Sequence, residues 1–246
     1  MAANRDPSTT GQAPPGGASP PGPILEDVSS STARRARLAG AHLYFVTDAA
    51  TEPAVLRGAL AGGTDMLQLR DPAARDDELL RAAAVFRALC DEFGALLWLN
   101  DRPDLALRAR ADGVHLGQDD MPVSDARGLV GDELLIGLST HSPEQLEAGI
   151  SAGADQLSVG PVWETPTKPG RPAAGLEYVR HAARRRPPVP WFAIGGIDSR
   201  NVGEVAAAGA TRAVAVRAIR DAPEPRAAAA ELRAALLERT TVGATQ

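Results

Sequence analysis

Short apolar runs alternate with longer amphipathic stretches through most of the chain. Compact runs of this kind are typical of strands that are buried on both faces. Four of these runs are 43–46, 96–99, 134–137 and 191–194. The other four form the last residues of the segments 61–69, 109–116, 151–159 and 207–216. Stretches with helical periodicity separate them, at 52–61, 76–93, 103–110, 122–130, 142–152, 175–186, 200–208 and 225–239. This alternation of strand and helix predicts a parallel sheet.

Four of the strand segments share one local pattern: AGGTDMLQL (61–69), ARADGVHL (109–116), SAGADQLSV (151–159) and AAGATRAVAV (207–216). Each ends a helix, turns on glycine or a small polar pair, and enters a strand. Eight strand–helix units over about 200 residues predict a (β/α)8 TIM barrel, and a doubly wound open sheet is the alternative.

The first 38 residues differ from the rest of the chain. They are rich in proline, glycine, serine and threonine and contain few large apolar residues, so burial would not repay the entropy of ordering them. We therefore expect a disordered leader at 1–38 and a barrel domain at 39–246. The leader lacks the pattern of a secretory signal, and no apolar run is long enough to span a membrane.

Composition narrows the function classes. The net charge of −5 argues against a nucleic-acid partner, because the protein as a whole has no excess positive charge to attract the phosphates of a nucleic-acid backbone. The single cysteine, Cys90, excludes an intramolecular disulfide and fits a reducing compartment, so we expect a cytoplasmic protein with a buried structural thiol. Small-molecule ligands are the expected partners, with a homodimer possible and no membrane association.

In a barrel, functional groups gather just after the C-terminal ends of the strands. Asp101 and Asp120 follow neighbouring strands there, and one or two carboxylates with substrate phosphate are a usual Mg²⁺ site. The alternative is that either aspartate caps the helix that follows it.

Amide, hydroxyl and cationic donors at the same end suit a diphosphate and a heteroaromatic ring; they are Gln68, Arg70, Asn100, Ser139 and Lys168. Two alternatives stay open: Arg70 forms a salt bridge to Asp71 or Asp101, and His115 is a core histidine. Gly195-Gly196 precedes a helix at the position where barrels commonly bind phosphate.

The stretch GPVWETPTKPGR (160–171) follows the sixth strand, and its prolines exclude regular structure. Threonine hydroxyls, free amides and a lysine suit an anion, typically phosphate. A proline-stiffened surface turn is the alternative.

Several motifs together resemble the thiamine phosphate synthase family. They are QLRD (68–71), ND (100–101), DGVHLGQDD (112–120), GLSTH (137–141), GPVWETPTKPGR (160–171) and AIGGI (193–197). The resemblance runs from 43 to 219 and implies a TIM-barrel transferase. Such an enzyme joins hydroxymethylpyrimidine diphosphate to a thiazole phosphate, with or without a carboxyl group, through a pyrimidine carbocation that forms when diphosphate leaves.

The resemblance also implies roles for single residues. Gln68, Arg70, Asn100, Ser139 and Lys168 would bind the pyrimidine diphosphate, with Arg70, Ser139 and Lys168 as the catalytic group, and Asp101 and Asp120 would ligate Mg²⁺. Thr165, Thr167, Gly196, Val216 and Arg217 would hold the thiazole phosphate, and His115 is a further substrate-binding candidate.

The chain departs from the family pattern at two positions. Pro72 stands where the family usually has a lysine, so we expect weaker diphosphate binding, or compensation by Arg75 or Arg171. Arg217 replaces a common serine, with little expected loss because that contact runs through the backbone. The competing functions are a thiazole tautomerase-like barrel and a non-catalytic phosphate-ligand sensor.

Overall fold

Eight parallel strands close into a barrel in the computed structural model, which describes Met1, residues 30–165 and residues 172–242, with side chains as far as 238. The strands are β1 Leu43–Thr47, β2 Met66–Leu69, β3 Leu96–Asn100, β4 Gly113–Leu116, β5 Leu135–Thr140, β6 Gln156–Val159, β7 Trp191–Ala193 and β8 Ala213–Ala215. They pair in chain order, and β8 returns to pair with β1. The predicted barrel is confirmed, and the open-sheet alternative is wrong because no strand is left at an edge of this sheet.

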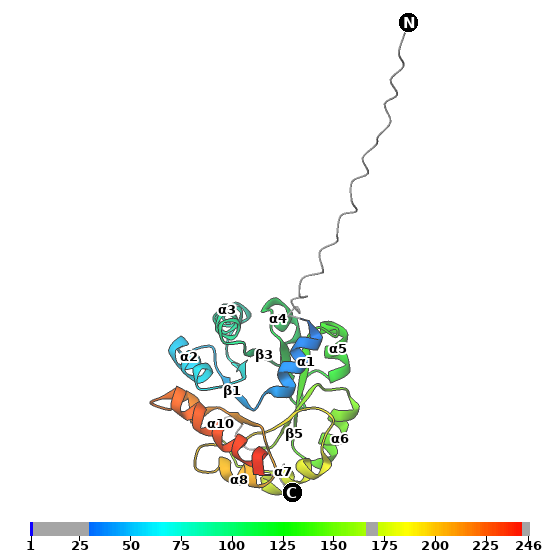
Figure 1. The fold of residues 1–246 in the computed structure, drawn as a ribbon. Helices are drawn as coiled ribbons and strands as arrows, with labels where there is room; N and C mark the ends of the chain where they lie inside the picture. Colours follow the sequence, from blue (N-terminus) through cyan, green and yellow to red (C-terminus); the bar gives the residue numbers. More distant parts are fainter. Residues whose placement is uncertain (2–29, 166–171, 243–246) are drawn as a thin grey trace.

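Most helices form an outer ring around the strands, and the first helix lies across one end of the barrel (Figure 1). They are α1 Ser31–Gly40, α2 Pro53–Ala61, α3 Asp76–Phe93, α4 Pro103–Arg108, α5 Val123–Val130, α6 Pro143–Ser151, α7 Gly175–Arg185, α8 Val202–Ala207, α9 Arg217–Arg220 and α10 Pro225–Val242. Single residues determine where some helices begin and end. Ser142 caps the start of α6 through its hydroxyl, and Gly94 ends α3 in the left-handed conformation. No described helix is long and apolar enough to cross a membrane.

The ordered body begins before the predicted boundary at residue 38. Helix α1 starts at Ser31, where the Ser30 hydroxyl accepts a hydrogen bond from the amide of Ala33. It lies across one end of the barrel, and its Leu38 is buried in the barrel interior (Figure 1). The prediction failed because STARRARLAG is mostly polar, and only a single leucine marks its buried side. The rest of the predicted leader, 2–29, lies outside the described residues.

Ion pairs fix α1 to the ends of two strands. Arg34 Nε donates to the Asp112 carboxylate at 3.1 Å, and Arg35 pairs with Asp155 at 3.1 Å. Both aspartates also accept an amide N–H from a neighbouring strand, of Leu97 and Ile136 respectively. The aspartate that precedes a strand in the repeated sequence pattern therefore closes the N-terminal end of the barrel.

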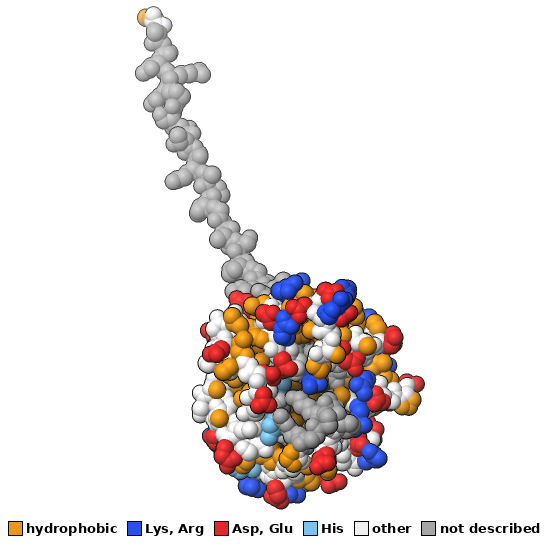
Figure 2. All heavy atoms as spheres, turned by 180° about the vertical axis from the view of Figure 1, so that it is seen from behind, with side chains coloured by type: hydrophobic (Ala, Val, Ile, Leu, Met, Phe, Trp, Pro, Cys, Tyr) orange, Lys and Arg blue, Asp and Glu red, His pale blue; other side chains and the backbone are white. Residues whose placement is uncertain are grey.

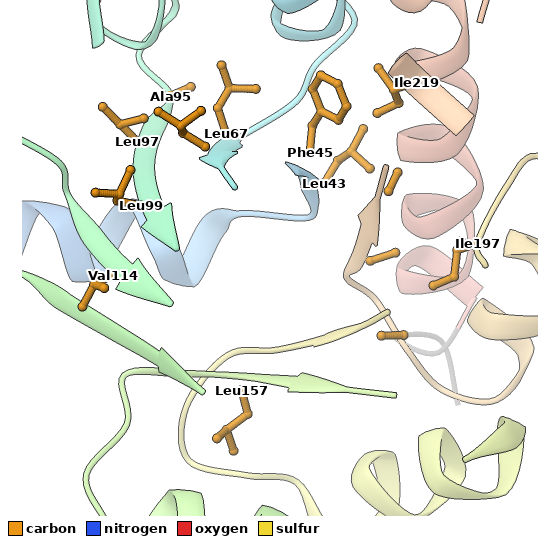
Figure 3. Packing of buried hydrophobic residues seen from close by; sticks show 14 of the residues in the cluster. Leu43, Phe45, Leu67, Ala95, Leu97, Leu99, Val114, Leu157, Ile197 and Ile219 are labelled. Atoms are coloured by element: carbon orange, nitrogen blue, oxygen red, sulfur yellow. The ribbon is translucent and has the colours of Figure 1, made fainter. Parts of the chain in front are cut away.

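Alternate strand residues separate two apolar layers. Leu43, Phe45, Leu67 and Leu97 point outward to the helices (Figure 3). Their neighbours point into the barrel, where Tyr44, Met66, Trp98, Leu135, Phe192 and Val214 form a second cluster with Leu38 of α1. This inner cluster fills the half of the barrel nearer the N-terminal ends of the strands. Only the C-terminal end of the strands is therefore left for a ligand.

Cys90 has the structural role expected of it. The residue lies in α3 within the outer apolar layer and is fully buried. Burial raises the pKa of the Cys90 thiol to about 12, so the thiol stays protonated and unreactive at neutral pH.

Candidate active site

A cavity of about 320 Å³ opens at the C-terminal ends of the strands. Figure 2, which looks at the molecule from behind the view of Figure 1, shows acidic and basic side chains around the middle of this face. The sequence-predicted residues that line the cavity are Gln68, Arg70, Asn100, His115, Ser139, Thr165, Gly196, Val216 and Arg217. Residues far apart in the sequence therefore meet in one site. Thr167 and Lys168, predicted for the same site, lie outside the described residues.

Arg70 is the cation most clearly directed to a ligand. Its backbone amide donates to Thr47 O at 2.8 Å, which extends the β1–β2 ladder to the cavity wall. Its Nε atom is buried and has no hydrogen-bond partner among the described residues. A buried donor without a partner costs about 1–3 kcal/mol, so the position favours an anion in the cavity.

The salt-bridge alternative for Arg70 is wrong for the part of the chain that the structure describes. The Asp71 carboxylate instead accepts hydrogen bonds from two backbone amides, of Ala49 at 3.3 Å and Ala73 at 3.2 Å. It thereby shapes the loops after β1 and β2. Arg70 keeps its charge available for the cavity.

Gln68 and Tyr44 form one side of the cavity floor. The Gln68 Nε2 group donates to Tyr44 Oη at 2.7 Å, and both side chains are buried. Burial raises the pKa of the Tyr44 hydroxyl well above its usual value, so the hydroxyl stays neutral. The ring of Tyr44 packs at an edge angle against Phe192, with centroids 5.7 Å apart, which supports the polar floor on the inner apolar cluster.

His115 lies on the other side of the floor and contacts Ser139. His115 Nε2 and Ser139 Oγ are 3.0 Å apart, and His115 Nδ1 is 3.2 Å from Gln156 Oε1. The side chain is buried, as the core-histidine alternative predicted, yet it also lines the cavity. The two readings are therefore compatible, because His115 is a buried residue of the cavity floor.

Two consecutive glycines shape a further part of the cavity edge, the glycine rim. Gly195 and Gly196 follow β7 with φ of 107° and 68°, a region that other residues rarely adopt. Ile194 O accepts from Val162 N at 2.8 Å and Gly195 O accepts from Trp163 N at 3.1 Å, which ties this rim to the start of the loop after β6. A Cβ atom on Gly195 would lie 2.5 Å from Pro161 Cα. The rim therefore requires glycine at this position.

The two metal candidates follow β3 and β4 as predicted, but neither lines the cavity described above. Asp101 adopts a φ of 60°, and its amide donates to His115 O at 2.9 Å. Asp120 Oδ2 accepts from Gly117 N at 2.7 Å. Arg102 and Pro122 occupy the N-cap positions of α4 and α5, so the alternative in which these aspartates cap the helices is wrong.

The donor set is compatible with Mg²⁺. Asp101 and Asp120 supply carboxylate oxygens at adjacent strand ends, and Mg²⁺ usually takes one or two carboxylates and completes its shell with waters and substrate phosphate. The described residues hold no cluster of three or more histidine, cysteine, aspartate or glutamate side chains that could enclose a metal by itself. A metal here would therefore depend on ligand oxygens.

Compensation for Pro72 by Arg75 is not supported. Arg75 is exposed and pairs with Asp77 at 3.5 Å and Glu78 at 3.1 Å, in the capping box of α3. Pro72 is itself exposed and does not line the cavity. The other proposed substitute, Arg171, lies outside the described residues.

Sequence reasoning missed several cavity residues, among them Tyr44, Ser158, Asp198 and Arg200. Tyr44 and Ser158 lie within strands, where an inward-facing polar group resembles core in a single sequence. The signal that could have found them is the period of two, because Tyr44 and Val46 share a face, as do Gln156 and Ser158. Arg200 pairs with Asp198 and lowers the pKa of that carboxyl.

Comparison with known proteins gives a consistent result. A family model described as "Thiamine monophosphate synthase" matches residues 43–219. A thiamine-phosphate synthase of Acidothermus cellulolyticus is 53% identical over 207 residues, which cover 82% of this chain and 98% of the relative. One of Thermobifida fusca is 51% identical over 208 residues, covering 82% and 95%.

Solved structures agree with the sequence comparison. A structure described as thiamine phosphate pyrophosphorylase from Pyrococcus furiosus superposes with a TM-score of 0.74 at 34% identity, covering 83% of this chain and 98% of that one. A 3-hexulose-6-phosphate synthase, with a TM-score of 0.58 and 22% identity, is similar in fold alone.

Proposed function

The chain belongs to the thiamine monophosphate synthase family, and we propose that it joins hydroxymethylpyrimidine diphosphate to a thiazole phosphate in the cavity at the C-terminal end of its barrel. The products are thiamine phosphate and diphosphate. The observation that carries this assignment of the site is the convergence of Gln68, Arg70, Ser139 and Gly196 on one cavity. Motifs from β2, β5 and β7 meet there.

Arg70 is positioned to stabilise the leaving group. In the proposed reaction the bond between the pyrimidine methylene carbon and the diphosphate oxygen breaks, and the oxygen keeps the electron pair. Negative charge therefore grows on the diphosphate, and a guanidinium with a buried, unpartnered Nε lies ready to bind it. The thiazole nitrogen then attacks the methylene carbon, so no protein nucleophile is needed.

The thiazole phosphate is assigned to the glycine rim. Gly196, Val216 and Thr165 line that side of the cavity, and Arg217 follows at the first position of α9. Backbone amides can approach phosphate oxygens closely where glycine leaves no side chain. Thr167 and Lys168 are assigned to the same ligands from the sequence alone.

Asp101 and Asp120 would hold Mg²⁺ with the diphosphate oxygens. When bound, the ion would neutralise charge on the departing diphosphate. Neither aspartate lines the described cavity, so the ion would be held jointly with oxygens of the bound diphosphate. A homodimer and a cytoplasmic location stay predictions from the sequence.

The metal assignment predicts different results for two adjacent aspartates. Asp120→Asn should raise the Mg²⁺ concentration that gives half-maximal rate by about 10- to 100-fold, because a ligand is lost. The matched variant Asp119→Asn should change it by less than about threefold. The measurement is diphosphate release against Mg²⁺ concentration, with calorimetric titration of Mg²⁺ into the enzyme saturated with pyrimidine diphosphate. Equal Mg²⁺ requirements in the two variants would contradict the assignment of Asp120.

A further inference from the structure

Gln156, the first residue of β6, is a buried amide that no ligand assignment includes. Its side chain is 0% exposed and forms hydrogen bonds at both ends. Oε1 is 3.2 Å from His115 Nδ1, and Nε2 donates to Ser158 Oγ at 3.2 Å. A buried amide costs free energy unless it is hydrogen-bonded, so this side chain has a defined orientation.

The barrel is shaped to let Gln156 reach His115 across an intervening strand. Gly137 of β5 pairs with His115 on one side and with Gln156 on the other. A Cβ atom at Gly137 would lie 2.4 Å from Gln156 Oε1 and 2.5 Å from His115 Nδ1. Any residue with a side chain at 137 would therefore displace one of them, and glycine opens the gap that the contact occupies.

The contact favours a proton on Nδ1 of the imidazole. Gln156 Nε2 donates to Ser158 Oγ, so Gln156 Oε1 faces His115 Nδ1, and this oxygen can accept a hydrogen bond only from an imidazole with its proton on Nδ1. In a neutral imidazole with its proton on Nδ1, Nε2 is an acceptor. Its partner, 3.0 Å away, is Ser139 Oγ. With this tautomer the Ser139 hydroxyl donates its proton to His115 Nε2, and its lone pairs remain for the cavity that Ser139 lines.

We propose that Gln156 is a positioning residue which, through the Nδ1–H tautomer of His115, makes Ser139 Oγ a hydrogen-bond acceptor for an N–H donor of the bound pyrimidine. The assignment of the pyrimidine to this cavity rests on the proposed function. As diphosphate leaves, positive charge grows on the ring and its N–H donors become stronger. An acceptor at Ser139 then binds the transition state more tightly than the ground state, whereas a hydroxyl proton turned to the ring would oppose it.

The tautomer can be read directly by ¹⁵N NMR of the wild-type enzyme labelled at its 4 histidines. The His115 resonances are assigned by their loss in His115→Asn. We expect at neutral pH a protonated Nδ1 and an unprotonated Nε2. A proton on Nε2 would overturn the proposal. The spectrum needs no catalytic turnover, so it is readable even if the proposed function fails.

A double-mutant cycle tests the route through Ser139. Gln156→Leu removes the acceptor with similar volume and should lower kcat about 10- to 100-fold, the usual effect of a supporting partner. In the Ser139→Ala background the same change should lower kcat less than about twofold, because the acceptor that Gln156 orients is already gone. An equal loss in both backgrounds would overturn the proposal.

The control is Thr140→Val. Thr140 lies on β5 next to Ser139, but its side chain faces outward, away from the cavity. Thr140 Oγ1 is buried, donates to Ser158 O and accepts from Tyr178 Oη, so its loss is a comparable loss of buried hydrogen bonds. We expect Thr140→Val to lower the melting temperature without a comparable fall in kcat. A fall in kcat as large as that of Gln156→Leu would mean that general loosening of β5 and β6 explains both, and would overturn the proposal. If Gln156→Leu does not fold, the wild-type spectrum still decides.

Discussion

Arg70→Ala should lower kcat for thiamine phosphate formation by about 10²- to 10³-fold, the usual effect of removing one preorganised charge stabiliser. The physical reason is that the buried Nε of Arg70 has no partner among the described residues. Its charge is therefore not neutralised within the described structure and acts on the developing negative charge of the diphosphate. Steady-state kinetics with both substrates measures the effect.

Two further variants sharpen this result. Arg70→Lys keeps the charge but loses the planar fork, so it should recover part of the lost rate and not all of it. Arg75→Ala is the matched control, because Arg75 is exposed and already paired with Asp77 and Glu78. It should change kcat by less than about twofold. A loss in Arg75→Ala as large as in Arg70→Ala would contradict the assigned role of Arg70 and revive compensation for Pro72.

Gly195→Ala should lower kcat/KM by about 10²-fold or more, with the larger share in the KM for the thiazole phosphate. The added Cβ would lie 2.5 Å from Pro161 Cα, and the φ of 107° is unfavourable for alanine. Backbone atoms cannot rotate away as a side-chain end can, so the rim that carries Gly196 must shift. Kinetics with each substrate varied in turn measures the split.

Gly153→Ala is the control for backbone strain alone. Gly153 has a φ of 79°, follows α6, and has no atom within 4 Å of an added Cβ. It should lose about 1 kcal/mol of unfolding free energy and keep both KM values. If Gly153→Ala and Gly195→Ala lowered activity equally, backbone strain would explain the loss of activity, and the shape of the glycine rim would not.

The strand positions could be predicted from the sequence because each strand is a compact apolar run between helix signals. The rule that barrels place function after strand ends then selected Arg70, Asn100 and Gly196 without structural data. Helix α1 could not be predicted, since its contacts to Asp112 and Asp155 join residues more than seventy positions apart.

Two polar residues at the floor of the cavity were not predicted from the sequence. Gln156 and Tyr44 lie within strands, where a period of two shows which residues share a face but not which face points into the barrel. The gap at Gly137 becomes meaningful only once β4, β5 and β6 are in register. The alternative in which Arg70 pairs with Asp71 could not be excluded from the sequence, because the two residues are adjacent; in the structure the Asp71 carboxylate accepts from backbone amides.

The central claim is that this cavity catalyses a Mg²⁺-dependent condensation rather than merely binding phosphates. The most direct test is to incubate the purified protein with hydroxymethylpyrimidine diphosphate and thiazole phosphate, and to quantify thiamine phosphate and diphosphate together. We expect the two products in equal amounts with Mg²⁺, and neither after chelation. Tight binding of both substrates with no diphosphate release at any Mg²⁺ concentration would contradict the account and indicate a phosphate-ligand sensor.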